Sequence, residues 1–353
     1  YDNPDLQDFN FDEAKCHYRL AEGHLTLDLK AQVAGKFNLS GTVNYDVKTK
    51  ATDLDLVFDQ LPLKVWLPPQ FKSGYNGTAR ATLKWHGQLD TKKDSVATIG
   101  VDLNGTHISN PILLRKFLSS KGFQVPDEIQ LDKAQFLFVY QNEIFTLTGA
   151  DLVAPGLLKA QLSGSLAPGD ELQAKMDWQG LVLGHFLPEK YAQYLSGVLD
   201  GHVALAVKKW QFGDGSYGGS VDLIGGRLTY TSPQSTLARF LDQRPLLTLP
   251  LTRTQFTWTW NNGAMTAKHI DIRGGDDLGV RGDIAFSGSS ALSGVLWIGA
   301  KPEYLTWLPD AETTVFKRKE DGLYWAKVQL SGTAKKPGQD FTADTRLSAF
   351  GAV

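Results

Sequence analysis

Apolar and polar residues alternate along most of this chain, and that pattern restricts it to a fold made of β-strands. In HLTLDLKAQV, the apolar residues Leu25, Leu27 and Leu29 alternate with the polar residues Thr26 and Asp28. A period of two puts successive side chains on opposite faces of a strand. The same pattern recurs in TVNYDV, TARATLKW, ATIGVDL, HVALAVKKW and GSVDLIGG, with Gly, Asn and Asp residues at the turns between them. The sequence therefore predicts a mainly β fold of antiparallel strands, each with one apolar face.

Two stretches break the alternation and predict short helices. SNPILLRKFLSSKG offers Asn110 as a cap and Pro111 at the first helical position, which predicts a helix near residues 110–121. SPQSTLARFLDQRP repeats the arrangement with Ser232 and Pro233, which predicts a helix near residues 232–243. A helix of about 12 residues is only about 18 Å long, so one helix per group of strands leaves apolar sheet face uncovered. That face must curl onto itself, meet a second sheet or bind an apolar ligand.

Sequence elements also recur at intervals of about 120 residues. The segment that starts at Leu131 aligns with the one that starts at Leu251, and Leu-Pro pairs occur at positions 67–68, 187–188 and 308–309. The aligned aromatic residues, each 120 residues from its counterpart, are Phe136, Phe138 and Tyr140 in the first segment and Phe256, Trp258 and Trp260 in the second. We predict one continuous, repeat-built domain of three β units at residues 1–142, 143–262 and 263–353, of which the first and last are incomplete. The units are expected to form a curled, twisted sheet, a trough or an open barrel.

The aligned aromatic residues have two interpretations. Because Phe, Trp and Tyr replace one another at three positions on one strand face, the aromatic character belongs to the repeated unit. In the first interpretation the rings pack under a helix of their own unit, as buried aromatic residues usually do. In the second, successive units align their apolar faces into a continuous groove. The residues predicted to line that groove are Leu25, Leu27, Leu29, Phe136, Phe138, Tyr140, Phe256, Trp258 and Trp260.

Other kinds of site have weak support in the sequence. The 36 basic and 38 acidic residues give a net charge of -2 without a basic block, which argues against nucleic-acid binding. The single cysteine, Cys16, excludes an internal disulfide and a cysteine-based zinc site, and the seven histidines lack metal-ligand spacing. The G-x-G-x-x-G match at Gly213, Gly215 and Gly218 precedes a strand pattern rather than a helix, and GGDD at residues 274–277 lacks the spacing of a calcium loop, so both predict turns. We predict no enzyme activity, no cofactor and no metal.

The segment from Asp222 to Phe286 resembles the C-terminal region of AsmA-like proteins of diderm bacteria. That family shows a Gly-containing strand, a Leu-rich helix, a strand, an Asn-Gly hairpin and two further strands. The matching residues are Gly226, Leu228, Leu237, Leu241, Phe256, Asn262, Gly263, Thr266, Ile270, Asp271, Val280, Gly282 and Ile284. The resemblance implies a periplasmic protein, usually anchored in the inner membrane, with a long β-sheet groove and a connection to outer-membrane assembly and lipid transport. It supplies no catalytic residues.

The sequence therefore favours a non-enzymatic, AsmA-like envelope protein that holds the acyl chains of a phospholipid or other acyl lipid in an apolar β groove. It holds no run of about 18 apolar residues that could span a bilayer. The resemblance therefore implies a membrane anchor in a segment outside this sequence and a location in the periplasm. One alternative is a structural or adaptor module with a sealed core that binds other envelope proteins. A second is a carbohydrate-binding β protein, suggested by the nine Trp residues, which requires exposed rings beside carboxylates.

Overall fold

The computed structural model of the chain consists mainly of antiparallel β-strands and divides into two compact units. Unit 1 comprises Tyr1–Met176 with Lys208–Trp210, and unit 2 comprises Asp177–Val207 with Gln211–Val353. The residues that the structure describes are 11–33, 37–63, 75–88, 91–103, 105–109, 111, 115, 124–208, 215–229, 248–261, 263–287, 291–306, 310–333 and 336–340.

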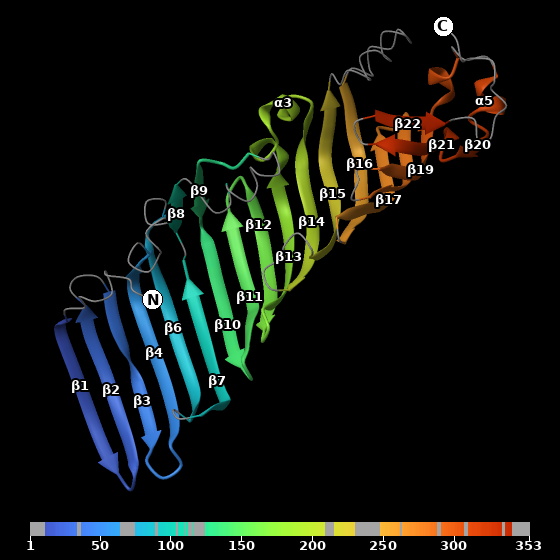
Figure 1. Cartoon of the computed structure of the whole chain (residues 1–353). Coiled ribbons are helices and arrows are strands. Elements are labelled where there is room, and N and C mark those ends of the chain that lie inside the picture. The colour runs from blue at the N-terminus through green and yellow to red at the C-terminus, as the bar shows by residue number, and fades with distance from the viewer. Residues whose placement is uncertain are drawn as a thin grey trace. The chain divides into compact units, whose positions relative to one another are not determined.

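Unit 1 is an antiparallel sheet whose strands pair mostly in chain order (Figure 1). Its strands are β1 (Phe11–Ala21), β2 (His24–Val33), β3 (Phe37–Asp46), β4 (Ala51–Pro62), β5 (Tyr75–Asn76), β6 (Thr78–Gln88), β7 (Thr91–Asp102), β8 (Thr106–Ser109), β9 (Glu128–Leu131), β10 (Lys133–Gln141), β11 (Ile144–Ala154) and β12 (Leu158–Ala167). β1 pairs with β2, and the pairing continues through β3, β4, β6, β7, β10 and β11 to β12. β5, β8 and β9 form a separate small sheet, and β13 (Glu171–Val182) spans the boundary between the two units.

Short turns connect neighbouring strands of unit 1. Gly23 between β1 and β2 has a φ of 87° and Gly156 between β11 and β12 has a φ of 71°, a region that glycine adopts without a Cβ clash. Between β3 and β4 the carboxylate of Asp46 accepts hydrogen bonds from the backbone N–H groups of Lys48 and Thr49 at 2.8 and 2.9 Å. Because connections this short join antiparallel neighbours, strand order in the sheet follows strand order in the chain.

Unit 2 is a second run of antiparallel strands that also contains short helices. Its strands are β14 (Leu195–Lys208), β15 (Ser216–Thr229), β16 (Thr248–Asn261), β17 (Ala264–Gly274), β18 (Leu278–Phe286), β19 (Leu292–Ala300), β20 (Arg318–Glu320), β21 (Leu323–Thr333) and β22 (Lys336–Asp340). β14 to β19 pair in chain order, β21 pairs with β19, and both β20 and β22 pair with β21. The helices are η3 (Leu183–His185), α3 (Glu189–Ala192), η6 (Pro302–Tyr304) and α5 (Ala311–Thr314).

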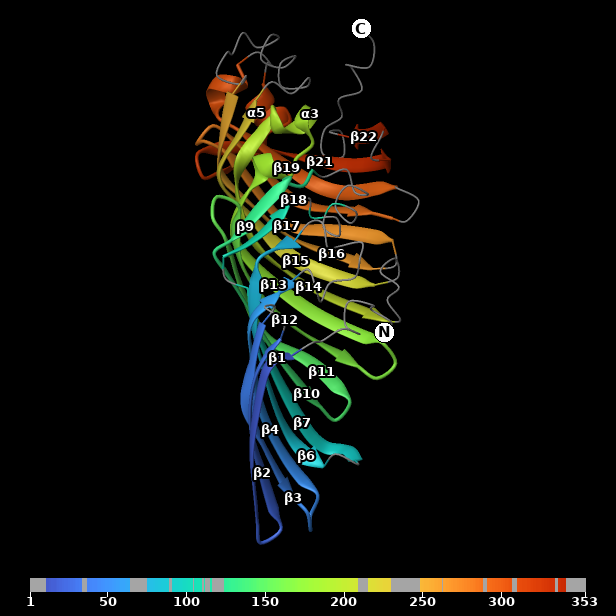
Figure 2. The same cartoon turned by 90° about the vertical axis from the view of Figure 1, so that its left-hand side faces the viewer.

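The helices of unit 2 gather at one end of its strands (Figure 2). Leu183 of η3 packs with Leu223 of β15 and Leu251 of β16 in one buried apolar cluster. Leu305, which follows η6, and Ala311 of α5 form a second buried cluster at the end of β19. The apolar side chains at this end are therefore withdrawn from water, and those at the opposite strand ends lack this cover.

The structure confirms the predicted fold class, which is mainly β with antiparallel strands, an open sheet and few helices. The order of elements also recurs: β10 to β13 lead into η3 and α3, and β16 to β19 lead into η6 and α5. The boundaries predicted for three units at residues 142 and 262 stay predictions. The helix predicted near residues 232–243 lies outside the described residues. Of the helix predicted near residues 110–121, only Pro111 and Arg115 are described, and the Arg115 N–H donates to the Pro111 carbonyl at 2.8 Å.

The predicted turns agree with the structure wherever it describes them. Asn261 pairs with Ala264 across the β16–β17 connection, where Gly263 has a φ of 77°. The GGDD stretch joins β17 to β18, with the Asp277 N–H donating to the Gly274 carbonyl at 3.3 Å. The strand predicted after the G-x-G-x-x-G match is β15. A dinucleotide site needs a helix at this point, so the match does not have the structure of one.

Candidate functional site

One face of the unit 1 sheet carries apolar residues in rows that cross every strand. The register places Leu27 of β2 opposite Val43 of β3, and Val43 opposite Leu54 of β4. The full row is Tyr18, Leu27, Val43, Leu54, Trp85, Ala97, Tyr140, Phe145 and Leu166. The next row is Cys16, Leu29, Gly41, Leu56, Leu83, Ile99, Phe138, Leu147 and Gly164. Directly opposite residues point to the same side of a sheet, so these rows form one surface, the apolar face of unit 1.

Six of the nine predicted groove residues lie on the apolar face of unit 1. They are Leu25, Leu27, Leu29, Phe136, Phe138 and Tyr140. Leu27 shares a row with Tyr140, and Leu29 shares the next row with Phe138, although more than 100 residues separate each pair in the sequence. The register of the intervening strands therefore brings these distant apolar patterns together.

The side chains of this face are half-buried. All six predicted residues keep intermediate exposure. The Phe138 ring stacks on Phe145 with centroids 5.2 Å apart, and it lies nearly parallel to Phe136 at 6.2 Å. Within the described part of unit 1, contacts between the strands of the main sheet join sheet neighbours. No second layer of described strands covers the rings, so part of each ring surface stays accessible.

The other three predicted residues lie on the apolar face of unit 2, which is built in the same way. Trp260 lies in the row Leu205, Tyr217, Trp260, Met265, Phe286 and Leu292. Trp258 lies in the row Val203, Gly219, Trp258, Ala267, Ile284 and Gly294. Phe256 is opposite Val221 on the same face. Phe256 and Trp258 are half-buried and Trp260 is 37% exposed, so all three rings stay partly accessible.

Glycine residues allow close approach of neighbouring strands in both units. Gly282 of β18 has a φ of 142°, and a Cβ on it would overlap the carbonyl oxygen of Val295 on β19. In unit 1, a Cβ on Gly41 of β3 would overlap the carbonyl oxygen of Asp55 on β4. At these two points the backbone of the neighbouring strand occupies the space that a side chain would fill. Glycine therefore allows the paired strands to approach closely there.

The opposite face of unit 1 is polar and carries cross-strand ion pairs. Lys84 of β6 lies opposite Asp55 of β4, with Nζ 3.4 Å from Oδ2. In the adjacent row, Nδ1 of His86 lies 2.5 Å from Oδ1 of Asp53. Both pairs are exposed, and exposed pairs contribute little stability. Their importance is that charge is confined to one side of the sheet, which leaves the other side apolar.

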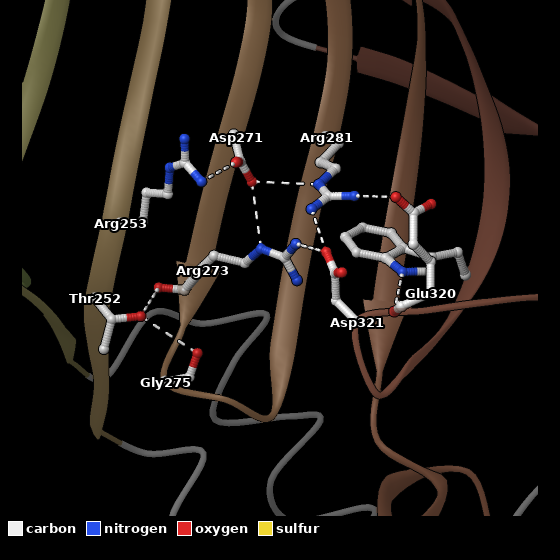
Figure 3. A network of polar contacts seen from close by, with 9 residues as sticks. Thr252, Arg253, Asp271, Arg273, Gly275, Arg281, Glu320 and Asp321 are labelled. Carbon is white, nitrogen blue, oxygen red and sulfur yellow. Dashed lines mark hydrogen bonds and ion pairs between the residues drawn. The ribbon is translucent and has the colours of Figure 1, made fainter.

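On the opposite face of unit 2, a polar network surrounds a buried tryptophan (Figure 3). Trp325 of β21 is 2% exposed, and its indole N–H donates to the Glu320 carbonyl at 3.1 Å. The guanidinium carbons of Arg273 and Arg281 lie 5.0 and 4.8 Å from the ring centroid. Asp271 lies between the two guanidinium groups, with its Oδ1 3.3 Å from Arg273 Nε and 3.4 Å from Arg281 Nε. This network joins β17, β18 and β21 on the side away from the apolar face.

Sequence reasoning missed this network. The indole of Trp325 covers Gly279 and Gly299, where a Cβ would come within 2.7 and 2.8 Å of ring atoms. A sequence signal existed, because Arg273 and Arg281 stand at polar positions of strands that alternate with apolar residues. The two arginines contact the same tryptophan because of the register between the strands. The alternation within one strand does not determine that register.

Asp321 makes the network sensitive to acid. Hydrogen bonds from Arg281 and Arg273, at 2.7 and 2.9 Å, hold the pKa of the Asp321 carboxyl below its usual range. A depressed carboxyl pKa stabilises the fold fully above the unfolded value of about 3.9, and this stabilisation is lost as the pH falls through the folded value. Asp321→Asn is therefore expected to lower the melting temperature at pH 6, and the difference from the unmodified protein is expected to shrink as the pH falls below about 3.9. Melting curves across this range test it, and a constant difference at all pH values would contradict it.

No other arrangement of reactive groups competes with these surfaces among the described residues. No group of three or more His, Cys, Asp or Glu side chains in that part of the chain is placed to hold a metal ion. Cys16 is a free, exposed thiol on β1. In the same described residues, no helix is long and apolar enough to cross a membrane. Comparisons with family models, with curated proteins and with solved structures give no match to the chain.

Proposed function

We propose that the apolar faces bind the acyl chains of a phospholipid or another acyl lipid, without catalysis. The observation that carries this proposal is the alignment of half-exposed apolar rows across all the main strands of unit 1. Removing one CH2 group from water contributes about 0.8 kcal/mol. An acyl chain that places a few of its carbons against one apolar row therefore binds with useful affinity, while the lipid headgroup stays in water.

The cellular role proposed for this binding is in the envelope of a diderm bacterium. The AsmA-like sequence pattern between Asp222 and Phe286 supports a periplasmic protein, anchored in the inner membrane through a further segment and connected with outer-membrane assembly or lipid transport. Envelope proteins are possible partners in that setting. An open apolar face suits such a role because lipids must be shielded from water between two membranes.

The two alternatives have less support from the structure. An adaptor with a sealed core requires a fully buried aromatic set, but none of the nine predicted residues is buried. A carbohydrate site requires exposed rings beside carboxylates. The acidic residues Asp53, Asp55 and Asp271 belong to the polar faces, opposite the aromatic rows.

Two neighbouring residues of β10 provide a matched test. Phe138 lies on the apolar face and Leu137, which is 45% exposed, lies on the other face. Phe138→Asp is expected to weaken uptake of a fluorescent phospholipid by the delipidated protein about tenfold or more, because a carboxylate replaces contacts worth about two CH2 groups. Leu137→Asp is expected to leave uptake unchanged. Fluorescence titration measures both, and mass spectrometry of the purified protein identifies any bound lipid.

A fold control separates loss of binding from loss of structure. Circular dichroism must show both variants folded, and Leu29→Asp on β2 repeats the test at the far side of the row that contains Phe138. If the unmodified protein takes up no lipid, or if folded variants on the two faces lose uptake equally, the proposal is wrong.

A further inference from the structure

A β-bulge in β17 places two consecutive polar side chains on the polar face of unit 2. Ala267 and Ile270 are successive buried residues of the apolar face, and regular alternation would leave one residue between them. Two residues, Lys268 and His269, lie there instead, and both are exposed. Bulges redirect side chains in this way and are over-represented next to functional sites.

The bulge also fixes the position of a carboxylate, that of Asp283 on β18. The backbone N–H of His269 donates to Oδ1 of Asp283 at 2.8 Å, and His269 has a φ of 53°, in the left-handed region that favours glycine. The bulge at the corresponding position of β11 contains Thr148 and Gly149, so a bulge at this point of the repeat does not need charged side chains. Non-glycine residues in this conformation cluster at ligand sites.

Next to Lys268 and Asp283 the polar face is hollowed. The hollow has a volume of about 420 Å³ and is lined by residues of β17, β18 and β19, a size that small-molecule sites commonly have. Thr266 and Ser293 contribute hydroxyl groups, and the register places both residues in one row of the polar face. The aromatic residue of the lining is Trp297 of β19.

Trp297 differs from the aromatic rows because it lies on the same face as these charged residues. It is paired with Arg281 on the polar face of unit 2. Its ring is half-buried, and the guanidinium carbon of Arg318 lies 5.5 Å from the ring centroid. The contact with Arg318 holds the indole in place, and the rest of the ring surface can contact a ligand in the hollow.

The chemistry of the lining narrows the class of ligand. An apolar ligand would take water from Lys268 and Asp283 without replacing their hydrogen bonds, which is costly. An anion would meet the carboxylate of Asp283, and a cation would meet the ammonium group of Lys268. A neutral ligand with several hydroxyl groups suits both residues, because a hydroxyl donates to a carboxylate and accepts from an ammonium group.

From these observations we infer that the hollow binds a neutral sugar in its six-membered ring form. Asp283 and Lys268 hold the hydroxyl groups, and the C–H face of the sugar ring packs against the indole of Trp297. The site lies on the face of unit 2 opposite the aromatic rows, so sugar binding does not depend on lipid binding.

Saturation-transfer NMR of the full chain tests the inference with the methyl glycosides of glucose, galactose, mannose and N-acetylglucosamine. At least one of the four is expected to bind, and a titration gives its dissociation constant. Trp297→Ala and Lys268→Met are each expected to raise that constant about tenfold. The inference is wrong if none of the four glycosides binds, or if Lys268→Met binds as tightly as the unmodified protein.

Two further variants separate the site from the fold and from non-specific binding. Asp283→Asn keeps an oxygen that can accept from the His269 N–H, so it is expected to weaken binding about tenfold at an unchanged melting temperature. If it does not fold, Lys268→Met decides, because Lys268 is exposed. Lys159→Met removes an exposed lysine from β12 of unit 1 and is expected to leave binding unchanged. An equal loss in Lys159→Met and Lys268→Met would place the sugar elsewhere and overturn the inference.

Discussion

Replacing Trp325 with alanine is expected to lower the free energy of unfolding of unit 2 by about 3–5 kcal/mol, the range for large-to-small changes at buried aromatic sites. The indole is 2% exposed and lies across Gly279 and Gly299, which have no side chains to fill the space. The substitution also removes the ring against which the guanidinium groups of Arg273 and Arg281 lie. The two arginines would then border a cavity, where they now pack against the indole ring.

A tryptophan on the other face of unit 2 is the matched control. Trp260 is 37% exposed, so Trp260→Ala is expected to cost clearly less. Urea denaturation followed by circular dichroism measures both changes, and hydrogen exchange of peptides from β17 to β21 locates them. Equal losses for the two variants would show that the network around Trp325 adds nothing to ordinary burial.

Gly282→Val is expected to destabilise unit 2 by about 3 kcal/mol or more. A non-glycine residue at such a φ costs about 1–3 kcal/mol, and overpacking adds about 1–3 kcal/mol. Here φ is 142°, and the new Cβ would overlap the carbonyl oxygen of Val295, which belongs to the neighbouring strand backbone. That backbone has to move, so hydrogen bonds between β18 and β19 are expected to be lost as well.

Gly184→Ala serves as the control for this substitution. Gly184 lies in η3 of the same unit, its φ is outside the positive range, and a Cβ there meets no atom within 4 Å. Its replacement is expected to leave stability nearly unchanged. Hydrogen exchange should show faster exchange in β18 and β19 for Gly282→Val alone. A Gly282→Val protein as stable as the Gly184→Ala protein would contradict the requirement for glycine at this position.

Much of the fold could be predicted from the sequence because period-two alternation determines both the element type and the face of each residue. The alternation at Leu25, Leu27 and Leu29 predicts β2, and the alternation at Phe136 and Phe138 predicts β10. Antiparallel pairing of neighbouring strands was equally accessible where short turns join them, whereas the pairing of β7 with β10 was not.

The exact rows were harder to predict because bulges change the phase of the alternation. In β17, Met265 and Ala267 share the apolar face with Ile270. Two residues therefore lie between Ala267 and Ile270, where regular alternation has one. His269 accommodates the extra residue with a φ of 53°. The break in the alternation is visible in the sequence. Which face of the sheet the residues after the break occupy depends on the partner strands.

The network around Trp325 was inaccessible for a different reason. Arg273, Arg281 and Trp325 come from three strands, and two glycines on intervening positions allow the indole to lie flat. The sequence of each strand alone shows charged residues or a ring at polar positions and does not show which of them meet. Only the register of the paired strands reveals that these side chains contact one another.

The pairing of each strand with its chain neighbours has a consequence for how such a protein changes over time. Within each unit, cohesion is local, because a strand depends on the two beside it and not on a central nucleus shared by all. Inserting or deleting a whole hairpin preserves the alternation of faces and disturbs a single junction. The length of a unit is thus a quantity that evolution or an engineer can adjust stepwise, in increments of two strands, without redesigning the rest.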